Sequence, residues 1–252
     1  MSAPLERRYC AIVEYDGTDF LGFQYQAIGR TIQGEIETSI RKVAQTEVRI
    51  SGAGRTDAGV HATGQVIAFN ISWKHSLLDL QRALNAILPP DIAVLDLNIV
   101  DQDFHPRFSA RSRSYCYKII NQLWPSALCH RYACHVRDTL DVAAMGQASR
   151  SLLGSHDFAS FGKPTQGSST IRNVMQAEWD VDGCLLKFSI TANAFLYRMV
   201  RKIVGSLIQV GLGQIAADEV QQILEAQDLT RSAPAVPAHG LYLVQVSYAD
   251  DG

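Results

Sequence analysis

Residues 47–71 read EVRISGAGRTDAGVHATGQVIAFNI: a short run of β-formers at 47–50, a glycine-rich loop, and a longer run of β-formers. Both flanking runs are expected to be strands, because β-branched and aromatic residues favour extended backbone. In an extended loop, residues two apart project to the same side, so Arg55 and Asp57 should point together while Thr56 points away. An arginine beside an aspartate stabilises the ionised carboxylate. Asp57 is therefore a candidate nucleophile or electrostatic stabiliser.

The same loop also has simpler interpretations. On composition alone, a glycine-rich turn with an Arg–Asp pair is more often structural than catalytic, because ordinary folds contain such pairs too. Two nucleotide-binding motifs fail at specific positions. In the Gly-x-Gly-x-x-Gly dinucleotide motif, Asp57 would occupy the place of the third glycine. In the phosphate-binding P-loop a lysine must follow the last glycine, whereas here Val60 follows Gly59.

The chain on either side of this stretch alternates between strand-like and helix-like segments. Thr31 can cap a helix with an apolar helical repeat, and Ser76 with Asp79 forms a capping pair before a second helix. The expected order in the first half is β-α-β-β-α-β: strand 8–15, a helix from 32, strands 47–50 and 63–71, helix 77–88, and strand 92–100.

The second half repeats much of this order. Its expected elements are strand 110–121, a helix capped by Asp141, strands 172–181 and 184–192 joined by the turn Asp182-Gly183, helix 197–211, a short helix from 218, and strand 241–248. We therefore predict an α+β fold of two ferredoxin-like β-α-β-β-α-β halves, with mainly antiparallel sheets and helices on one side. The expected halves are residues 1–105, with the Asp57 loop, and residues 106–252.

Bulk composition is that of an ordinary globular protein, with 252 residues, 47% hydrophobic and 19% charged. The amino terminus is charged and lacks an apolar signal region. The most apolar helix candidate, residues 195–212, is interrupted by three basic residues, so no membrane span is expected. The 5 cysteines include no Cys-x-x-Cys pair. Reduced thiols in the cytoplasm are the simplest account.

Four possible metal ligands lie close together in the pairs Cys129-His130 and Cys134-His135. Structural zinc sites usually pair ligands two to four residues apart and complete the set with a second such pair elsewhere. No second pair is evident in the sequence, so no metal is expected.

The net charge is 23 − 25 = −2, which by itself disfavours a nucleic-acid binder. The distribution of charge points the other way. Residues 104–137 contain 6 Lys/Arg and no acid, and residues 183–217 contain 4 Lys/Arg and no acid. Such acid-free windows predict a positive surface that attracts polyanions through counterion release.

Two elements in these windows could supply that surface. In the strand at 110–118, the odd-numbered positions would form one cationic and aromatic face: Arg111, Arg113, Tyr115 and Tyr117. Such a face suits base stacking and phosphate binding, although ordinary cross-strand pairs use the same residues. In the helix at 197–211, basic side chains would share a face that is either an RNA contact or simply solvated: Arg198, Arg201 and Lys202.

The sequence argues against two further classes of enzyme. Glycosidases generally use two carboxylates, whereas a single aspartate stands out here. The His-x-Glu and Pro-Cys-x-x-Cys signature of zinc base deaminases does not occur in the sequence. What remains is covalent or electrostatic chemistry on a nucleobase by one aspartate.

The segment Gly54-Arg55-Thr56-Asp57-Ala58-Gly59-Val60-His61-Ala62 resembles the active-site motif of TruA-type tRNA pseudouridine synthases. Further blocks resemble the same family, so the similarity spans nearly the whole chain: Tyr15-Asp16-Gly17-Thr18, residues 104–110, residues 193–207 and Gly240-Leu241-Tyr242-Leu243. One departure is visible, since Phe23 stands where many members carry tryptophan. That mild change in aromatic packing leaves the catalytic motif intact.

The resemblance implies the pseudouridine synthase fold and an isomerase, an intramolecular transferase, that converts uridine to pseudouridine without cofactor or metal. Its substrates would be uridines at positions 38, 39 and 40 in the anticodon stem-loop of tRNA. Asp57 would attack either C6 of the base or C1′ of the sugar. Arg55 would pair with Asp57 and help displace the target base from its stack. Tyr115 would stack on the uracil and assist removal of the proton from C5.

The resemblance also implies roles for residues around Asp57, Arg55 and Tyr115. Arg201 matches a basic residue that forms a salt bridge with the aspartate, and Leu241 matches an apolar pocket wall. The other basic residues of the two elements are expected to bind RNA: Arg111, Arg113, Arg198 and Lys202. Family members act as homodimers with tRNA crossing both subunits, so a cytoplasmic homodimer is expected.

A non-catalytic RNA-binding module or tRNA chaperone with the same fold is the alternative. Such a protein has no use for a carboxylate near anionic RNA. The presence of Asp57 beside Arg55 therefore favours the enzyme.

Overall fold

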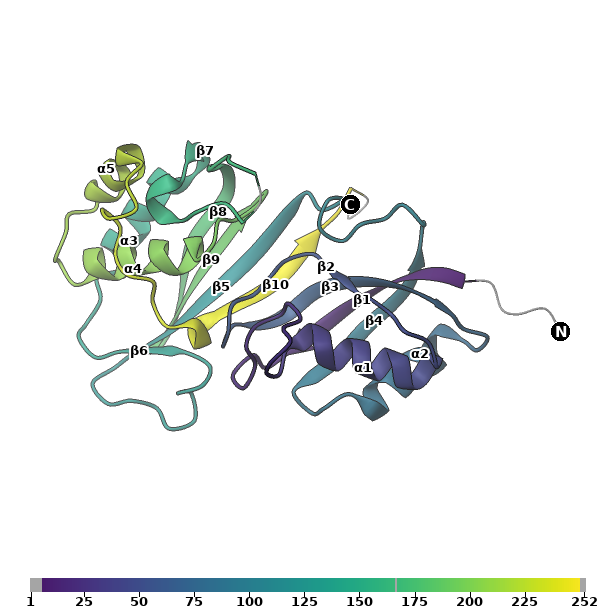
Figure 1. Cartoon of the computed structure of the whole chain (residues 1–252). Helices are drawn as coiled ribbons and strands as arrows, with labels where there is room; N and C mark the ends of the chain where they lie inside the picture. The colour runs from purple at the N-terminus through teal and green to yellow at the C-terminus, as the bar shows by residue number, and fades with distance from the viewer. Residues whose placement is uncertain (1–5, 166, 250–252) are drawn as a thin grey trace. The chain divides into compact units, whose positions relative to one another are not determined.

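The computed structural model describes residues 6–165 and 167–249. The chain divides into two compact units, Met1–Arg111 with Leu243–Gly252, and Ser112–Tyr242 (Figure 1). The division differs from the expected halves, since residues 106–111 and the end of the chain belong with the first unit. The last strand accounts for part of this difference, because it is hydrogen-bonded to a central strand of the first unit.

The first unit contains the predicted β-α-β-β-α-β order. Its sheet has the order β4-β1-β3-β10, and β2 pairs with β3. Strand β1 is antiparallel to both of its neighbours, β3 and β4. The elements are β1 (Glu6–Tyr15), α1 (Ile32–Ala44), β2 (Ser51–Gly52), β3 (His61–Ser72), α2 (Leu77–Ile87), β4 (Ile92–Val100) and β10 (Leu241–Ser247).

Local sequence signals explain where these helices begin. The Thr31 side chain accepts a hydrogen bond from the backbone N–H of Gly34 at the start of α1. Ser76 and Asp79 form the complete capping box at the start of α2. Both caps satisfy N–H groups that have no partner inside the helix, as predicted. The predicted strand at 47–50 is wrong, because those residues are irregular and pairing with β3 begins only at Ser51.

The helices of the first unit cover one face of its sheet (Figure 1). Burial alternates along β1, where Tyr9, Ala11, Val13 and Tyr15 are at most 2% exposed while Ile12 on the other face is 37% exposed. The buried face carries the core, because α1 and α2 place their apolar side chains against it. The prediction of helices on one side is confirmed for this unit.

The second unit has a sheet with the order β5-β9-β8-β7, and β6 runs parallel to the end of β5. Two of these strands, β6 and β7, were not expected from the sequence, because each is only a few residues long. The elements are β5 (Ser112–Asn121), β6 (Cys134–Val136), α3 (Val142–Ser149), β7 (Gly154–Asp157), β8 (Ile171–Asp182), β9 (Leu185–Ala192), α4 (Met199–Gly211) and α5 (Glu219–Ala226).

Helix α4 lies at the core of this unit. Its apolar side chains Val200, Ile203, Val204 and Leu207 are at most 4% exposed, as the helical repeat predicts. Helix α3 packs on α4 and begins at the predicted cap, where Asp141 accepts from the backbone N–H of Ala144. Across residues 6–165 and 167–249, none of the helices combines the length and apolarity needed to cross a membrane.

Close approach of two strands in the first unit gives a test of its packing. A Cβ atom at Gly64 on β3 would overlap the backbone carbonyl of Val244 on the neighbouring strand β10. We expect Gly64→Ala to lower the free energy of unfolding by about 1–3 kcal/mol, the usual cost of overpacking. Urea unfolding measures the change.

The matched control is Gly146→Ala in α3, where a Cβ atom has open space. This substitution should be neutral or slightly stabilising, because alanine favours helix by up to about 1 kcal/mol over glycine. Equal stability of the two variants would contradict the proposed packing of β3 against β10.

Candidate active site

The glycine-rich loop connects β2 to β3 in the first unit. Residues 54–57 have no regular secondary structure, and the backbone N–H of Val60 donates to the carbonyl of Asp57 to close the following turn. Thr56 is buried, whereas Arg55 is exposed and Asp57 is half-buried. This alternation places Thr56 on the protein side of the loop and leaves Arg55 and Asp57 on the accessible side, as predicted.

A buried glutamine holds the start of the loop. Gln65 on β3 is 0% exposed, and its side-chain amide is hydrogen-bonded to both the backbone N–H and the backbone carbonyl of Gly54. The N–H of Gly54 donates to Gln65 Oε1 at 3.3 Å, and Gln65 Nε2 donates to the Gly54 carbonyl at 2.9 Å. The same Nε2 lies 3.3 Å from the hydroxyl of Tyr15. Because a buried amide is costly to leave unpaired, this network fixes the path of the loop.

The inward face of the loop is fixed in a second way. The hydroxyls of Tyr15 and Thr56 are hydrogen-bonded at 2.8 Å inside the core. The backbone N–H of Phe23 donates to the Thr56 carbonyl at 3.0 Å. Gly22 has φ of 98° and passes so close that a Cβ atom would sit 2.8 Å from this carbonyl. Asp57 thus follows a residue that is anchored through both its side chain and its backbone.

The Tyr15–Thr18 block supports the other end of the loop. Buried His61, the first residue of β3, accepts a hydrogen bond at Nδ1 from the backbone N–H of Gly17 at 3.1 Å. Asp16 accepts from both the backbone N–H and the hydroxyl of Thr18. The contact between Gly17 and His61 could not be predicted from a local pattern, because its partners are 44 residues apart and only the fold joins them.

In the second unit, the predicted cationic and aromatic face of β5 is not an exposed surface. Arg113, Tyr115 and Tyr117 are 9%, 9% and 0% exposed. Arg113 donates from Nη1 to the carbonyl of Asn193 at 3.0 Å, and the Tyr117 hydroxyl donates to Pro237. The error arises because alternation along a strand identifies a face but not whether protein or solvent covers it. Arg111, the remaining member, lies in the first unit just before β5 and is exposed.

Tyr115 is held by an aromatic neighbour. Its ring meets the ring of Phe195 edge-on, with centroids 4.9 Å apart. This edge-to-face contact orients the phenol ring. Leu241, the first residue of β10, is 6% exposed.

The predicted basic face of α4 is also corrected. Helix α4 begins at Met199, so Arg198 is its N-cap residue, with φ of 60° in the left-handed region. Arg198 is exposed, and its guanidinium lies 4.9 Å from the centre of the Tyr197 ring. Arg201 donates from Nε to the Val236 carbonyl at 2.7 Å. The three cations therefore do not form one solvent-facing row.

Lys202 points into its own unit. Its Nζ binds the carbonyls of Leu229 and Ala233 at 3.3 Å and the hydroxyl of Ser232 at 2.9 Å. Burial lowers the pKa of this ammonium below its ordinary value. The lysine secures the segment at 229–233 instead of extending towards a ligand.

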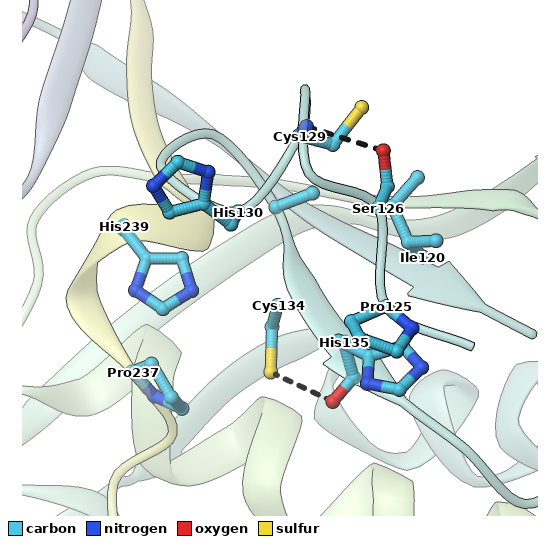
Figure 2. A pocket seen from close by; sticks show the side chains of 10 residues that line it. Ile120, Pro125, Ser126, Cys129, His130, Cys134, His135, Pro237 and His239 are labelled. Atoms are coloured by element: carbon cyan, nitrogen blue, oxygen red, sulfur yellow. Dashed lines mark hydrogen bonds between the residues drawn. The ribbon is translucent and has the colours of Figure 1, made fainter.

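A separate cavity of about 260 Å³ lies in the second unit, beneath the loop that joins β5 to β6 (Figure 2). The two Cys-His pairs line it together with His239 and Pro237. Burial lowers the pKa of the His239 imidazole and raises the pKa of the Cys134 thiol. Among the described residues, no three His, Cys, Asp or Glu side chains are grouped so that they could hold a metal ion.

Comparison with known proteins identifies the family to which this chain is similar. Residues 11–109 and 148–249 match the family described as tRNA pseudouridine synthase. A "tRNA pseudouridine synthase A" of Roseiflexus castenholzii is 44% identical over 246 residues, which cover 95% of this chain and 90% of the relative. A protein of the same name from Geobacillus kaustophilus is 40% identical over 249 residues, covering 98% and 96%.

This chain belongs to the tRNA pseudouridine synthase family. Membership makes it an isomerase of the class that forms pseudouridine in tRNA. The matched segments include Arg55, Asp57, Arg201 and Leu241, whereas Tyr115 lies between them, in the part covered only by the individual relatives. A solved chain of an archaeal box H/ACA sRNP Nop10-Cbf5 complex aligns with 96% of this chain and 50% of its own length, at 9% identity and a TM-score of 0.40. That likeness adds nothing to the family assignment.

The pseudouridine synthase loop should depend on Gln65 for its position. We expect Gln65→Met to lower kcat for pseudouridine formation by about ten- to a hundred-fold, because a displaced nucleophile loses its near-attack geometry. KM should change little, because the substituted side chain is buried and cannot touch RNA. Steady-state kinetics on an unmodified tRNA transcript measure both constants.

The matched control is Gln81→Met on α2, since Gln81 also donates its amide to backbone carbonyls, those of Val94 and Leu95. It should leave kcat unchanged. A kcat for Gln65→Met equal to that of the control would refute the positioning role of the glutamine.

Substitutions of Arg198 and Lys202 should have different effects on tRNA binding and on stability. Arg198→Met should reduce the slope of log affinity against log salt by about 1, because an exposed arginine can neutralise a phosphate. Lys202→Met should leave the slope unchanged and lower the free energy of unfolding by about 1–3 kcal/mol, because three oxygen acceptors lose their donor. Fluorescence titration of tRNA at several salt concentrations, with urea unfolding, distinguishes the two effects. A changed slope for Lys202→Met would restore the original prediction of a basic helix face.

Proposed function

We propose that this chain isomerises uridine to pseudouridine at positions 38, 39 and 40 in the anticodon stem-loop of tRNA, with Asp57 as its nucleophile. The observation that carries the proposal is the half-buried Asp57, placed on the accessible side of a loop that Gln65, Thr56 and Gly22 hold from behind. A carboxylate fixed in this way can attack without reorganising its surroundings.

The net reaction moves one glycosidic bond. The N1–C1′ bond breaks, a C5–C1′ bond forms, the proton on C5 leaves, and N1 gains a proton. A carboxylate oxygen of Asp57 adds either to C1′, with uracil as the leaving group, or to C6, and is released again when the new bond is complete. No electrons leave the substrate, so the reaction needs no redox cofactor.

Other residues act around that nucleophile. Arg55 emerges on the same side of the loop as Asp57 and is exposed, which suits both pairing with the carboxylate and displacement of the target base. Tyr115 stacks on the uracil and assists loss of the C5 proton, with its ring oriented by Phe195. Arg201 forms a salt bridge with the aspartate, and Leu241 supplies an apolar pocket wall.

The basic residues divide into two groups according to their present contacts. Arg111 and Arg198 are exposed and bind tRNA phosphates. Arg113 and Lys202 donate to oxygen atoms of their own unit and support the binding surface without contacting RNA. The protein works in the cytoplasm as a homodimer, with tRNA crossing both subunits.

A non-catalytic RNA-binding module is the competing function. The site disfavours it, because a carboxylate on the accessible side of a loop repels RNA unless chemistry requires it. Turnover decides between the two.

Replacing the nucleophile tests the proposal directly. Asp57→Ala should lower pseudouridine formation by roughly a thousand-fold or more, because the covalent route is lost. The variant should still bind tRNA, since the removed group is an anion. Release of tritium from C5 of labelled uridine in tRNA follows the reaction, because C5 loses its proton.

Asp101→Ala is the control, since Asp101 is an exposed carboxylate at the end of β4 with the same charge. It should retain wild-type activity. Full activity of Asp57→Ala would exclude Asp57 as the nucleophile, and absence of activity in the wild type on unmodified tRNA would favour the binding module.

A further inference from the structure

The turn at residues 104–109, which follows β4 in the first unit, displays an aromatic ring to solvent. Phe108 is 74% exposed. The backbone beneath it is closed by two hydrogen bonds between His105 and Ser109, one from Ser109 N–H to the His105 carbonyl and one from His105 N–H to Ser109 Oγ. The exposure of Phe108 is therefore built into an ordered turn.

A histidine ring forms the centre of this turn. His105 Nδ1 accepts from the backbone N–H groups of Arg107 and Phe108, at 3.1 and 3.4 Å. The imidazole also lies against the Phe108 ring, with centroids 4.4 Å apart. Burial, with Arg8 and Arg107 nearby, lowers the pKa of His105. A neutral imidazole thus supports one side of the phenyl ring, while the rest of the ring remains uncovered.

The base of the turn is anchored to its own unit on two sides. The Tyr248 hydroxyl donates to the Pro106 carbonyl at 2.8 Å, and its ring lies 5.1 Å from that of Phe104. Arg8 on β1 donates from Nε to the Phe104 carbonyl at 2.7 Å. These contacts remove most of the ordering cost that a flexible loop would incur on binding a ligand.

A cation accompanies the exposed ring. The Arg107 guanidinium lies 5.9 Å from the centre of the Phe108 ring. Burial, and then the positive charge of Arg55, lowers the pKa of Arg107. A guanidinium next to an exposed ring can bind a phosphate while the ring stacks on the neighbouring base.

We propose that the turn at 104–109 is a second RNA-binding element, in which Phe108 stacks an unpaired base of the tRNA and Arg107 binds the adjoining phosphate. An exposed aromatic ring next to arginine is the combination that single-stranded RNA segments recognise. A protein partner with an apolar surface would not need the arginine. The inference rests on the proposed function, because it takes tRNA as the ligand.

The test is a set of substitutions at Phe108. Phe108→Ala should raise KM for tRNA about ten- to a hundred-fold, the loss expected from one stacked base, with little change in kcat. Phe108→Tyr should restore most of the affinity, because it keeps a flat ring. Phe108→Trp should bind and show quenching of its added fluorescence on titration with tRNA, as stacking brings a base against the indole.

Two further variants complete the experiment. Leu78→Ala on α2 removes an apolar side chain that is 52% exposed outside the turn, and it should leave KM unchanged. Arg107→Ala should raise KM and reduce the salt slope of tRNA binding by about 1, whereas Arg107→Lys should keep most of the slope but less of the affinity. Urea unfolding of Phe108→Ala should match the wild type, since the ring is exposed.

The outcomes separate this inference from the proposed function. A wild type that forms pseudouridine, with an unchanged KM for Phe108→Ala, overturns the stacking role and leaves the function intact. A wild type without turnover, whose tRNA affinity nevertheless falls in Phe108→Ala, refutes the function and keeps the RNA-binding element. A loss of stability in Phe108→Ala with no rescue by Phe108→Tyr assigns the ring a structural role and overturns the inference.

Discussion

The hydrogen bonds between the Gln65 amide and Gly54 set the geometry on which the active-site loop depends. Gln65 is completely buried, so its two polar atoms must find partners within the protein. The N–H and carbonyl of Gly54 satisfy both atoms only while the loop keeps its present path. Since side chains alternate along that path, fixing Gly54 also fixes which residues face outward: Arg55 and Asp57 do, and Thr56 does not.

Features governed by local rules could be predicted from the sequence. The caps at Thr31, Ser76 and Asp141 lie where hydrogen-bonding side chains precede apolar helical repeats, and the structure confirms them. The glycine-rich loop was also identifiable, because the motif is contiguous. The start of α4 was missed, because Arg198 adopts a left-handed conformation that a non-glycine residue rarely takes. No local pattern identifies such a residue.

Which side chains face solvent is harder to predict from the sequence. Arg113 and Lys202 lie in strand and helix patterns that resemble a basic surface, yet both donate to oxygen atoms of the second unit. A long cationic side chain can pass through apolar surroundings and end on backbone carbonyls. Its periodicity is then that of a surface residue, although its partners lie tens of residues away and only the folded chain brings them near.

The internal hydrogen bonds of Arg113 and Lys202 change the interpretation of the two acid-free windows, residues 104–137 and 183–217. Where a cation donates to backbone carbonyls, their dipoles stabilise its charge without a nearby acid, so part of the charge asymmetry is explained by folding alone. On the function proposed above, attraction for RNA comes from the exposed arginines and from Arg107. A few well-placed guanidiniums are enough, because each neutralised phosphate releases counterions whatever the net charge of the chain. A protein with a formal charge of −2 can therefore bind a polyanion through a few exposed arginines.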